Sequence, residues 1–92
     1  MMPSQTVVDR YLQEAMAQSE VESLADGTYV ASVPACPGAL GFGDSVDQAR
    51  TDLAISLADW VRLGLQRRHH IPVLSGIDLN TEEARALAES SA

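Results

Sequence analysis

The sequence predicts an α+β domain in which a small antiparallel sheet of three to four strands packs against one long helix, with an added N-terminal helix. Two observations predict this class. Short segments of alternating apolar and polar residues flank an Asp-Gly turn at residues 26–27, and an apolar repeat at helical spacing follows from residue 46 to residue 65. Because the strands precede the long helix in succession, we expect the helices on one face of the sheet.

Residues 1–19 are predicted to form the N-terminal helix. Apolar residues recur at spacings of three and four from Val7 to Met16, with polar residues between them. Ser4 and Thr6 are both candidate N-caps, and Thr6 followed by Asp9 is a variant of the capping box. The helical pattern fades near residue 19, where the period changes.

Residues 20–75 are predicted to form the core, in the order β-β-β-α-β. The Asp-Gly pair favours a hairpin between strands near residues 21–24 and 29–33, since glycine adopts positive φ without steric cost. Pro34 and Pro37 interrupt the pairing, because proline has no N–H to donate, and residues 39–42 form a brief third strand. Residues 71–74 are expected to add an edge strand, where proline is tolerated.

The long helix within this core has the clearest signals. Ser45 and Gln48 fit a capping box, and Asp44 and Asp47 complement the positive end of the helix dipole. The apolar surface that follows is wider than a small sheet needs. We expect it to hold the helix on the sheet or on a second copy of the chain through five residues: Val46, Leu53, Leu57, Trp60 and Val61.

The length allows one domain, 1–92, whose last part, residues 76–92, is a tail with a short helix capped near Thr81. Thirteen acidic residues against six basic ones, all of them arginine, give a net charge of -7. This balance argues against nonspecific nucleic-acid binding, which depends on neutralising phosphates, and suits a basic protein partner. The chain starts without a signal-peptide pattern and has no apolar run near the ~20 residues that span a bilayer, so we expect a cytoplasmic protein without membrane contact.

Catalytic and metal-binding residues are not predicted. Asp44, Asp47, Asp52 and Asp59 suggest a metal-dependent nuclease, but their spacing favours helix-capping and solvated roles. The adjacent histidines at 69–70 diverge on a helix and have no further Cys or His pair to complete a zinc site, so a solvated helix end is favoured. Cys36 has no neighbour in the sequence that would lower its pKa, and we expect a small half-buried side chain. A binding role without a cofactor follows.

From residue 26 to residue 80 the sequence resembles the HicB-type antitoxin family, in its small HicB-like form. The family pattern is a Gly-Tyr-type strand entering P-x-x-P-G, then G-[DT]-[ST]-x-x-[EQ]-A at the start of a long helix, then an Ile-Pro pair. The matching segments here are Gly27–Tyr29, Pro34–Gly38, Gly43–Ala49 and Ile71–Pro72. Each motif alone has low specificity, whereas their order and intervals together are specific.

The resemblance implies a partial RNase-H-like domain that has lost nuclease activity. It also implies a role in neutralising a small, basic, RNA-cleaving toxin of the HicA type, and assembly into homodimers or higher oligomers. Many HicB proteins continue into a DNA-binding module, but the segment after Ile71–Pro72, Gly76–Ala92, has a single arginine and is too short and acidic for one, so direct DNA binding is not expected. The usual paired glutamates at the helix start are replaced by Asp47 and Gln48.

The leading hypothesis is therefore a non-enzymatic antitoxin of a type II toxin–antitoxin system. Its expected toxin-binding residues are Asp44, Asp47, Asp52 and Asp59. Two alternatives stay open. One is a residual metal-dependent nuclease of RNase-H-like fold, and the other is a solitary oligomeric module that binds another protein or a ligand.

Overall fold

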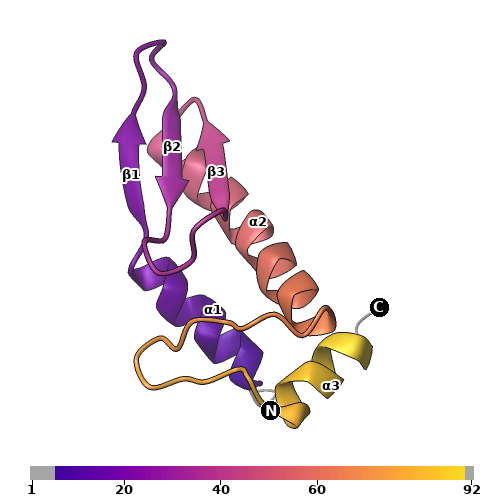
Figure 1. Cartoon of the computed structure of the whole chain (residues 1–92). Helices are drawn as coiled ribbons and strands as arrows, with labels where there is room; N and C mark the ends of the chain where they lie inside the picture. Colours follow the sequence, from indigo (N-terminus) through magenta and orange to yellow (C-terminus); the bar gives the residue numbers. More distant parts are fainter. Residues whose placement is uncertain (1–5, 91–92) are drawn as a thin grey trace, which may run out of the picture.

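The structure is a computed structural model that describes residues 6–90. Its elements are α1 (Val7–Ala17), β1 (Glu20–Ser23), β2 (Tyr29–Ser32), β3 (Leu40–Gly43), α2 (Val46–Gln66) and α3 (Glu82–Ser90). Figure 1 shows a three-stranded sheet with α2 running along one of its faces. The α+β class predicted from the sequence is confirmed.

The sheet is an antiparallel meander in the order β1-β2-β3. Val21, Ala31 and Gly41 are aligned across it on one face, and the neighbouring row on the other face contains Val30 and Phe42. The first row faces α2 and has small or half-buried side chains. The positions predicted for the first three strands are each within one residue of those observed, because the Asp-Gly turn and the prolines fix where pairing can begin and end.

The helix α2 approaches β3 very closely because β3 presents glycines to it. A methyl group placed on Gly41 would meet the Leu53 amide nitrogen and the Ala49 carbonyl oxygen of α2. No other residue type leaves room for this backbone-to-backbone contact. Along the same side of α2, Leu53, Leu57 and Val61 are fully buried, and they form the centre of the hydrophobic core.

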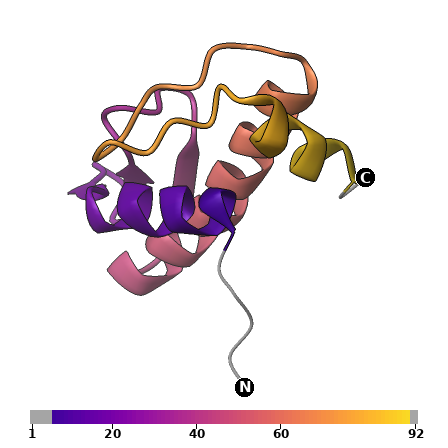
Figure 2. The same cartoon turned by 90° about the horizontal axis from the view of Figure 1, so that it is seen from below.

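The predicted position of the N-terminal helix on the sheet is wrong. α1 lies beyond one end of the sheet, beside the second half of α2, as Figures 1 and 2 show from two directions. Its buried residues are Tyr11 and Ala15. A three-stranded sheet is about as wide as one helix, so α2 already covers it and α1 packs on the exposed second half of α2 instead.

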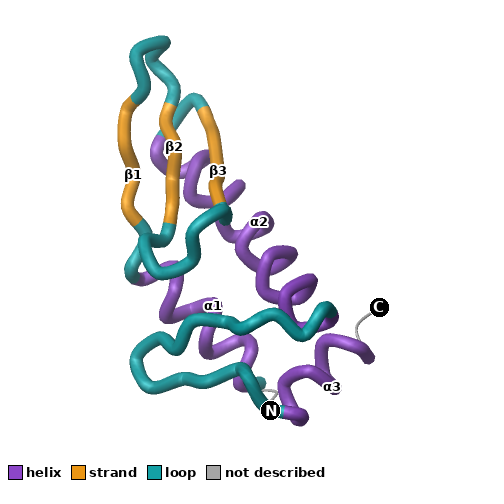
Figure 3. The backbone as a smooth tube through the Cα atoms, in the orientation of Figure 1, coloured by secondary structure: helices purple, strands orange, loops and turns teal. Residues whose placement is uncertain are grey.

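The edge strand expected at residues 71–74 is also absent. Figure 3 shows this part of the chain as a long loop between α2 and α3, within which Leu74 and Ile77 form only an isolated bridge. The Asn80 side chain takes the place of a neighbouring strand: the Ile71 N–H donates to its Oδ1 (2.7 Å) and its Nδ2 donates to the Ile71 carbonyl (2.8 Å). Pro72 cannot donate to a strand, and its carbonyl accepts a 2.6 Å hydrogen bond from the Tyr11 hydroxyl.

Both predicted helix caps are present. The Thr6 hydroxyl accepts from the Asp9 N–H, and the Asp9 carboxylate accepts from the Thr6 N–H, which completes the capping box. The alternative cap, Ser4, lies outside the described residues. At α2 the Ser45 hydroxyl accepts from the Gln48 N–H, but the Gln48 side chain accepts from the Asp44 N–H rather than completing a box with Ser45. The Asp44 N–H is therefore already paired.

The short helix α3 packs against the end of α2. Its Arg85 guanidinium donates to the Leu65 carbonyl (3.3 Å) and to the His69 carbonyl (3.5 Å). These carbonyls lie at and beyond the C-terminal turn of α2, where a positive side chain is favourable. Among residues 6–90, no helix is long and apolar enough to cross a membrane.

Candidate partner-binding surface on the long helix

The four aspartates predicted to bind a partner lie along α2 but differ in their surroundings. Asp44 precedes the helix and Asp47 is in its first turn, and the carboxylates of both make no hydrogen bond or ion pair with any described residue. Asp52 and Asp59 each have a partner. The two aspartates at the start of α2 are therefore the ones whose charge remains available.

The Asp52 carboxylate connects the helix α2 to the sheet. Its Oδ2 accepts a 2.9 Å hydrogen bond from the Phe42 N–H of the edge strand β3. One turn earlier, the Gln48 Oε1 accepts a 2.9 Å hydrogen bond from the Asp44 N–H. Unpaired N–H groups on an edge strand invite pairing with other chains, and here α2 side chains accept from one N–H in β3 and from one directly after it. The expectation of a purely solvated Asp52 is therefore wrong.

Asp59 forms an ion pair with Arg62, with an Nη2–Oδ1 distance of 3.0 Å. Both side chains are exposed, 57% for Asp59 and 45% for Arg62, so water and salt screen the pair. The negative charge of Asp59 is balanced locally. Its contribution to the field of the helix is consequently smaller than that of Asp47.

A shallow groove on α2 contains the best-placed of these residues. It has a volume of about 300 Å³ and is lined by Asp47, Gln48, Thr51, Asp52 and Ile55. Ile55 is 62% exposed, the highest value among the large apolar residues that are described. We call these five residues the α2 groove. An exposed apolar side chain beside two carboxylates has the composition of a protein-binding surface for a basic partner.

The residues predicted for the core or an interface between copies separate into two groups. Leu53, Leu57 and Val61 are fully buried. Val46 is 41% exposed because it lies in the first turn of α2, at the end of the sheet, and Trp60 is half-buried beside the loop that precedes β3.

The outer face of the sheet is a second exposed apolar surface. Phe42 is 53% exposed and Leu40 is 43% exposed, and Val30 lies opposite Phe42 in the register. No helix of the described chain covers these three residues, which we call the outer sheet face. This surface was not predicted. The signal was present, since the glycines at 41 and 43 alternate with Leu40 and Phe42 and must face the helix.

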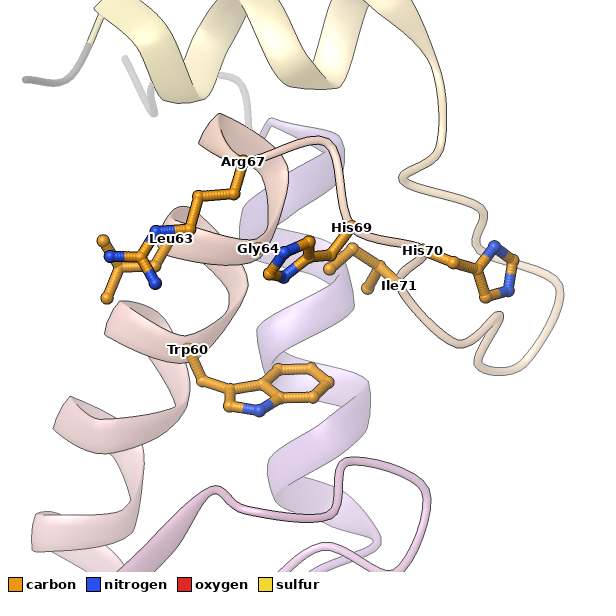
Figure 4. Close-up of a pocket in the computed structure, with 7 residues that line it drawn as sticks. All are labelled: Trp60, Leu63, Gly64, Arg67, His69, His70 and Ile71. Carbon is orange, nitrogen blue, oxygen red and sulfur yellow. The ribbon is translucent and has the colours of Figure 1, made fainter.

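A pocket of about 310 Å³ lies at the C-terminal end of α2 and was not predicted either. It is lined at the end of α2 by Trp60, Leu63, Gly64 and Arg67, and in the following loop by His69, His70 and Ile71. Figure 4 shows the Trp60 indole and the His69 ring on the same side of α2, and the Arg67 guanidinium beside Leu63. The His70 imidazole points in a different direction from the His69 ring, so the adjacent histidines diverge as expected.

Cys36 is fully buried rather than half-buried. Its sulfur lies 3.6 Å from the Tyr11 hydroxyl oxygen, and because that hydroxyl gives its one proton to the Pro72 carbonyl, the thiol is the donor in this contact. Burial raises the pKa of the Cys36 thiol above its ordinary value. The thiol therefore serves packing and does not form a reactive thiolate at neutral pH. Among residues 6–90, no group of three or more His, Cys, Asp or Glu side chains could hold a metal ion.

Comparisons with known proteins agree with this architecture. The model of a protein family described as UPF0150-like matches residues 10–72. The crystal structure of TTHA0281 from Thermus thermophilus is similar, with 32% sequence identity and a TM-score of 0.75, over 82% of this chain and 94% of that one. None of the curated proteins compared with the sequence matches it.

Proposed function

Since this chain belongs to the UPF0150-like family, a family of small HicB-like, antitoxin-like proteins, we propose that it binds and masks a small, basic, RNA-cleaving toxin of the HicA type. The net charge of -7 supports this proposal, because an acidic protein attracts a basic partner and accelerates their encounter. In this proposal the protein acts by binding the toxin and covering its surface, and it has no catalytic role of its own.

The observation that carries the proposal is the α2 groove. Ile55 is exposed on the middle of a helix whose first turn presents the uncompensated carboxylates of Asp44 and Asp47. An apolar residue that is buried on association supplies affinity, and the carboxylates around it select a partner with arginine and lysine side chains. We place the toxin on this groove, with Asp47 and Asp52 beside its basic residues. Asp59 contributes less, since Arg62 already balances it.

The proposal includes self-association through the outer sheet face. Exposed Leu40 and Phe42 and their neighbour Val30 form an apolar surface on the side of the sheet opposite α2. A second copy that packs its own outer face here would bury these residues and leave both α2 grooves open. The toxin and the second copy therefore occupy different surfaces.

The arrangement of the aspartates supports binding over nuclease activity. Two-metal phosphoryl chemistry needs carboxylates that converge on the same ions. Asp52 is bonded to the β3 backbone and Asp59 is paired with Arg62, so these two side chains have structural partners. RNA cleavage by the protein alone with added magnesium or manganese tests the nuclease alternative.

The experiment is co-expression with a small basic protein from a neighbouring reading frame, if there is one, followed by size-exclusion chromatography with light scattering and an assay of RNA cleavage. We expect a stable complex in which cleavage by the partner is suppressed. Ile55→Ser should weaken the complex by about 30-fold, the effect of losing a well-packed interface residue. Asp47→Asn should slow association, most strongly at low salt. Val73→Ser is the matched control, because Val73 is 52% exposed but lies in the loop before α3.

Self-association is measured on the same samples. Phe42→Ser should lower the mass measured by light scattering for the free protein and leave toxin binding unchanged. An Ile55→Ser variant that binds the partner as tightly as the wild type would contradict the placement on α2. Cleavage of RNA by the protein alone with added magnesium or manganese, lost in Asp52→Asn, would contradict the non-enzymatic role.

A further inference from the structure

The pocket at the C-terminal end of α2 is positively charged in a protein that is otherwise acidic. Arg67 and His69 line it together with Trp60, and its lining includes no carboxylate. Net charge of the whole chain is -7, so this local reversal of sign needs its own explanation. Exposure to water at a helix end explains why charged side chains are found here. It does not explain why they line a pocket together with the half-buried Trp60 indole.

The charged and polar side chains that line this pocket lack protein acceptors. The Arg67 guanidinium and the His69 ring make no hydrogen bond with any described residue. The neighbouring arginines differ, because Arg62 is paired with Asp59 and Arg68 with Glu82, each at 3.0 Å. The nearby acidic side chains are therefore engaged elsewhere, and Arg67 keeps an uncompensated charge.

Two main-chain carbonyls beside the pocket are already engaged in hydrogen bonds within the protein. The Gly64 carbonyl accepts from the His69 N–H (2.8 Å), and the Leu63 carbonyl accepts from the Arg67 N–H (3.0 Å). These bonds close the last turn of α2 and engage the carbonyls that a helix end would otherwise leave free. A ligand that enters the pocket therefore meets N–H donors, and a group that accepts hydrogen bonds with negative charge matches them.

The rest of the pocket is apolar. The Trp60 indole, the Leu63 side chain and the buried Ile71 side chain form this part of its lining. A methyl group at Gly64 would lie 2.7 Å from the Ile71 Cδ1, so the glycine lets the Ile71 side chain pack directly against α2. The pocket volume of about 310 Å³ is at the lower end of the range for small-molecule sites, which suits one aromatic ring and its substituent.

We propose that this pocket binds a small planar anion, an aromatic ring that carries a phosphate or a carboxylate. The anionic group pairs with the Arg67 guanidinium, whose planar fork fits both oxyanions, and the ring packs against the Trp60 indole. The His69 ring, which also lines the pocket, donates a further hydrogen bond. This site is separate from the α2 groove and from the outer sheet face.

The test uses the protein alone and follows the fluorescence of Trp60, which is the only tryptophan in the chain. The probes are adenosine monophosphate, benzoate and inorganic phosphate, titrated up to about 10 mM, with isothermal calorimetry as a second measurement. We expect a saturable change with at least one of the two ring-bearing anions and binding at least tenfold weaker for inorganic phosphate. Adenosine monophosphate alone would identify a phosphate ligand, and benzoate alone a carboxylate ligand.

Arg67→Gln should weaken binding of the ring-bearing anion at least tenfold. Arg62→Gln is the matched control, because Arg62 is on the same helix but faces away from the pocket and pairs with Asp59. Both arginines are exposed, so neither change should unfold the protein, and circular dichroism checks this. The proposal is overturned if neither ring-bearing anion binds, or if Arg67→Gln binds as tightly as the wild type.

Discussion

The Tyr11 hydroxyl donates a 2.6 Å hydrogen bond to the carbonyl of Pro72, a residue 61 positions away in the chain. This bond joins α1 to the loop between α2 and α3, neither of which belongs to the sheet. Tyr11 is completely buried, and its ring is part of the hydrophobic core. Pro72 has no backbone N–H to donate to a neighbouring strand, but its carbonyl accepts a hydrogen bond. Through this bond it helps to hold α1 against the loop.

Tyr11→Phe should lower the free energy of unfolding by about 1–3 kcal/mol, because the Pro72 carbonyl loses a partly buried partner while the ring stays in place. Urea denaturation followed by circular dichroism measures this change. Tyr29→Phe is the matched control, since the Tyr29 hydroxyl makes no hydrogen bond with any described residue. Equal effects of the two substitutions would show that the bond to Pro72 has no special role.

Stability should fall at alkaline pH. Burial, reinforced by the contact with Cys36, raises the pKa of Tyr11 well above its ordinary value of 10.0, and burial raises the pKa of Cys36 above 9.0. The unfolded chain therefore releases these protons at lower pH than the folded protein does. The stabilisation is complete below pH 9, and it decreases as the pH rises through the ordinary values toward the raised ones. Urea midpoints at pH 7, 9, 10 and 11 should fall in the wild type, with a smaller fall in Tyr11→Phe.

Asp52→Ala should destabilise the protein by about 1–2 kcal/mol, because the Phe42 N–H on the edge strand loses its charged acceptor. Asp52→Asn keeps an acceptor oxygen and should cost less than half as much. Thermal unfolding measures the difference between these two variants. If both lose the same stability, the carboxylate charge and not the hydrogen bond to β3 is what matters. If neither loses any, the edge of the sheet does not need this acceptor.

Gly41→Ala should destabilise the protein by about 3 kcal/mol, at the upper end for overpacking, because the added methyl group would meet backbone atoms of α2. Gly27→Ala provides the comparison. Gly27 has φ +87° and no atom within 4 Å of the added carbon, so only the cost of a left-handed conformation applies, about 1–2 kcal/mol. A larger loss for Gly27→Ala would mean that α2 can move away from β3.

Asn80→Ala should destabilise the protein by about 2 kcal/mol, because both the N–H and the carbonyl of Ile71 lose their partner. Asn80→Asp retains an oxygen for the Ile71 N–H but brings a carboxylate oxygen against the Ile71 carbonyl and the Asp78 carboxylate, which both accept from the Asn80 Nδ2 at 2.8 Å, and should destabilise the protein at least as much as Asn80→Ala. Chemical denaturation of the three proteins measures this order. The prediction is wrong if Asn80→Asp is as stable as the wild type.

Local signals predicted most of this fold. The Thr6 and Ser45 caps, the Asp-Gly turn and the apolar repeat of α2 act through neighbours in the sequence, so a pattern suffices to find them. The expected fourth strand failed because its backbone groups are satisfied by Asn80 and Tyr11, nine and 61 positions away. Hydrogen bonds from distant side chains, which here take the place of a neighbouring strand, produce no periodic pattern in the sequence.

The candidate sites were predicted less completely for a similar reason. The aspartates of α2 were evident as charges, but the partners of Asp52 and Asp59 decide which charges remain available, and the partner of Asp52 is on another element. The pocket at the end of α2 had a usable signal. Trp60, Gly64 and Arg67 follow one another at spacings of four and three, which places them on one side of a helix, with a gap at the glycine.

The order of contacts along the chain has a consequence for how the protein folds. β1, β2, β3 and α2 each pack against the next element, so the loops that close between them are short. The contact between Tyr11 and Pro72 closes a loop of 61 residues, which costs more chain entropy. We therefore expect the meander and α2 to form first, and the loop after α2 to dock on α1 last. In the folded protein that docking should open most often, and amide hydrogen exchange should be faster at Leu74 and Ile77 than at Leu53 or Leu57.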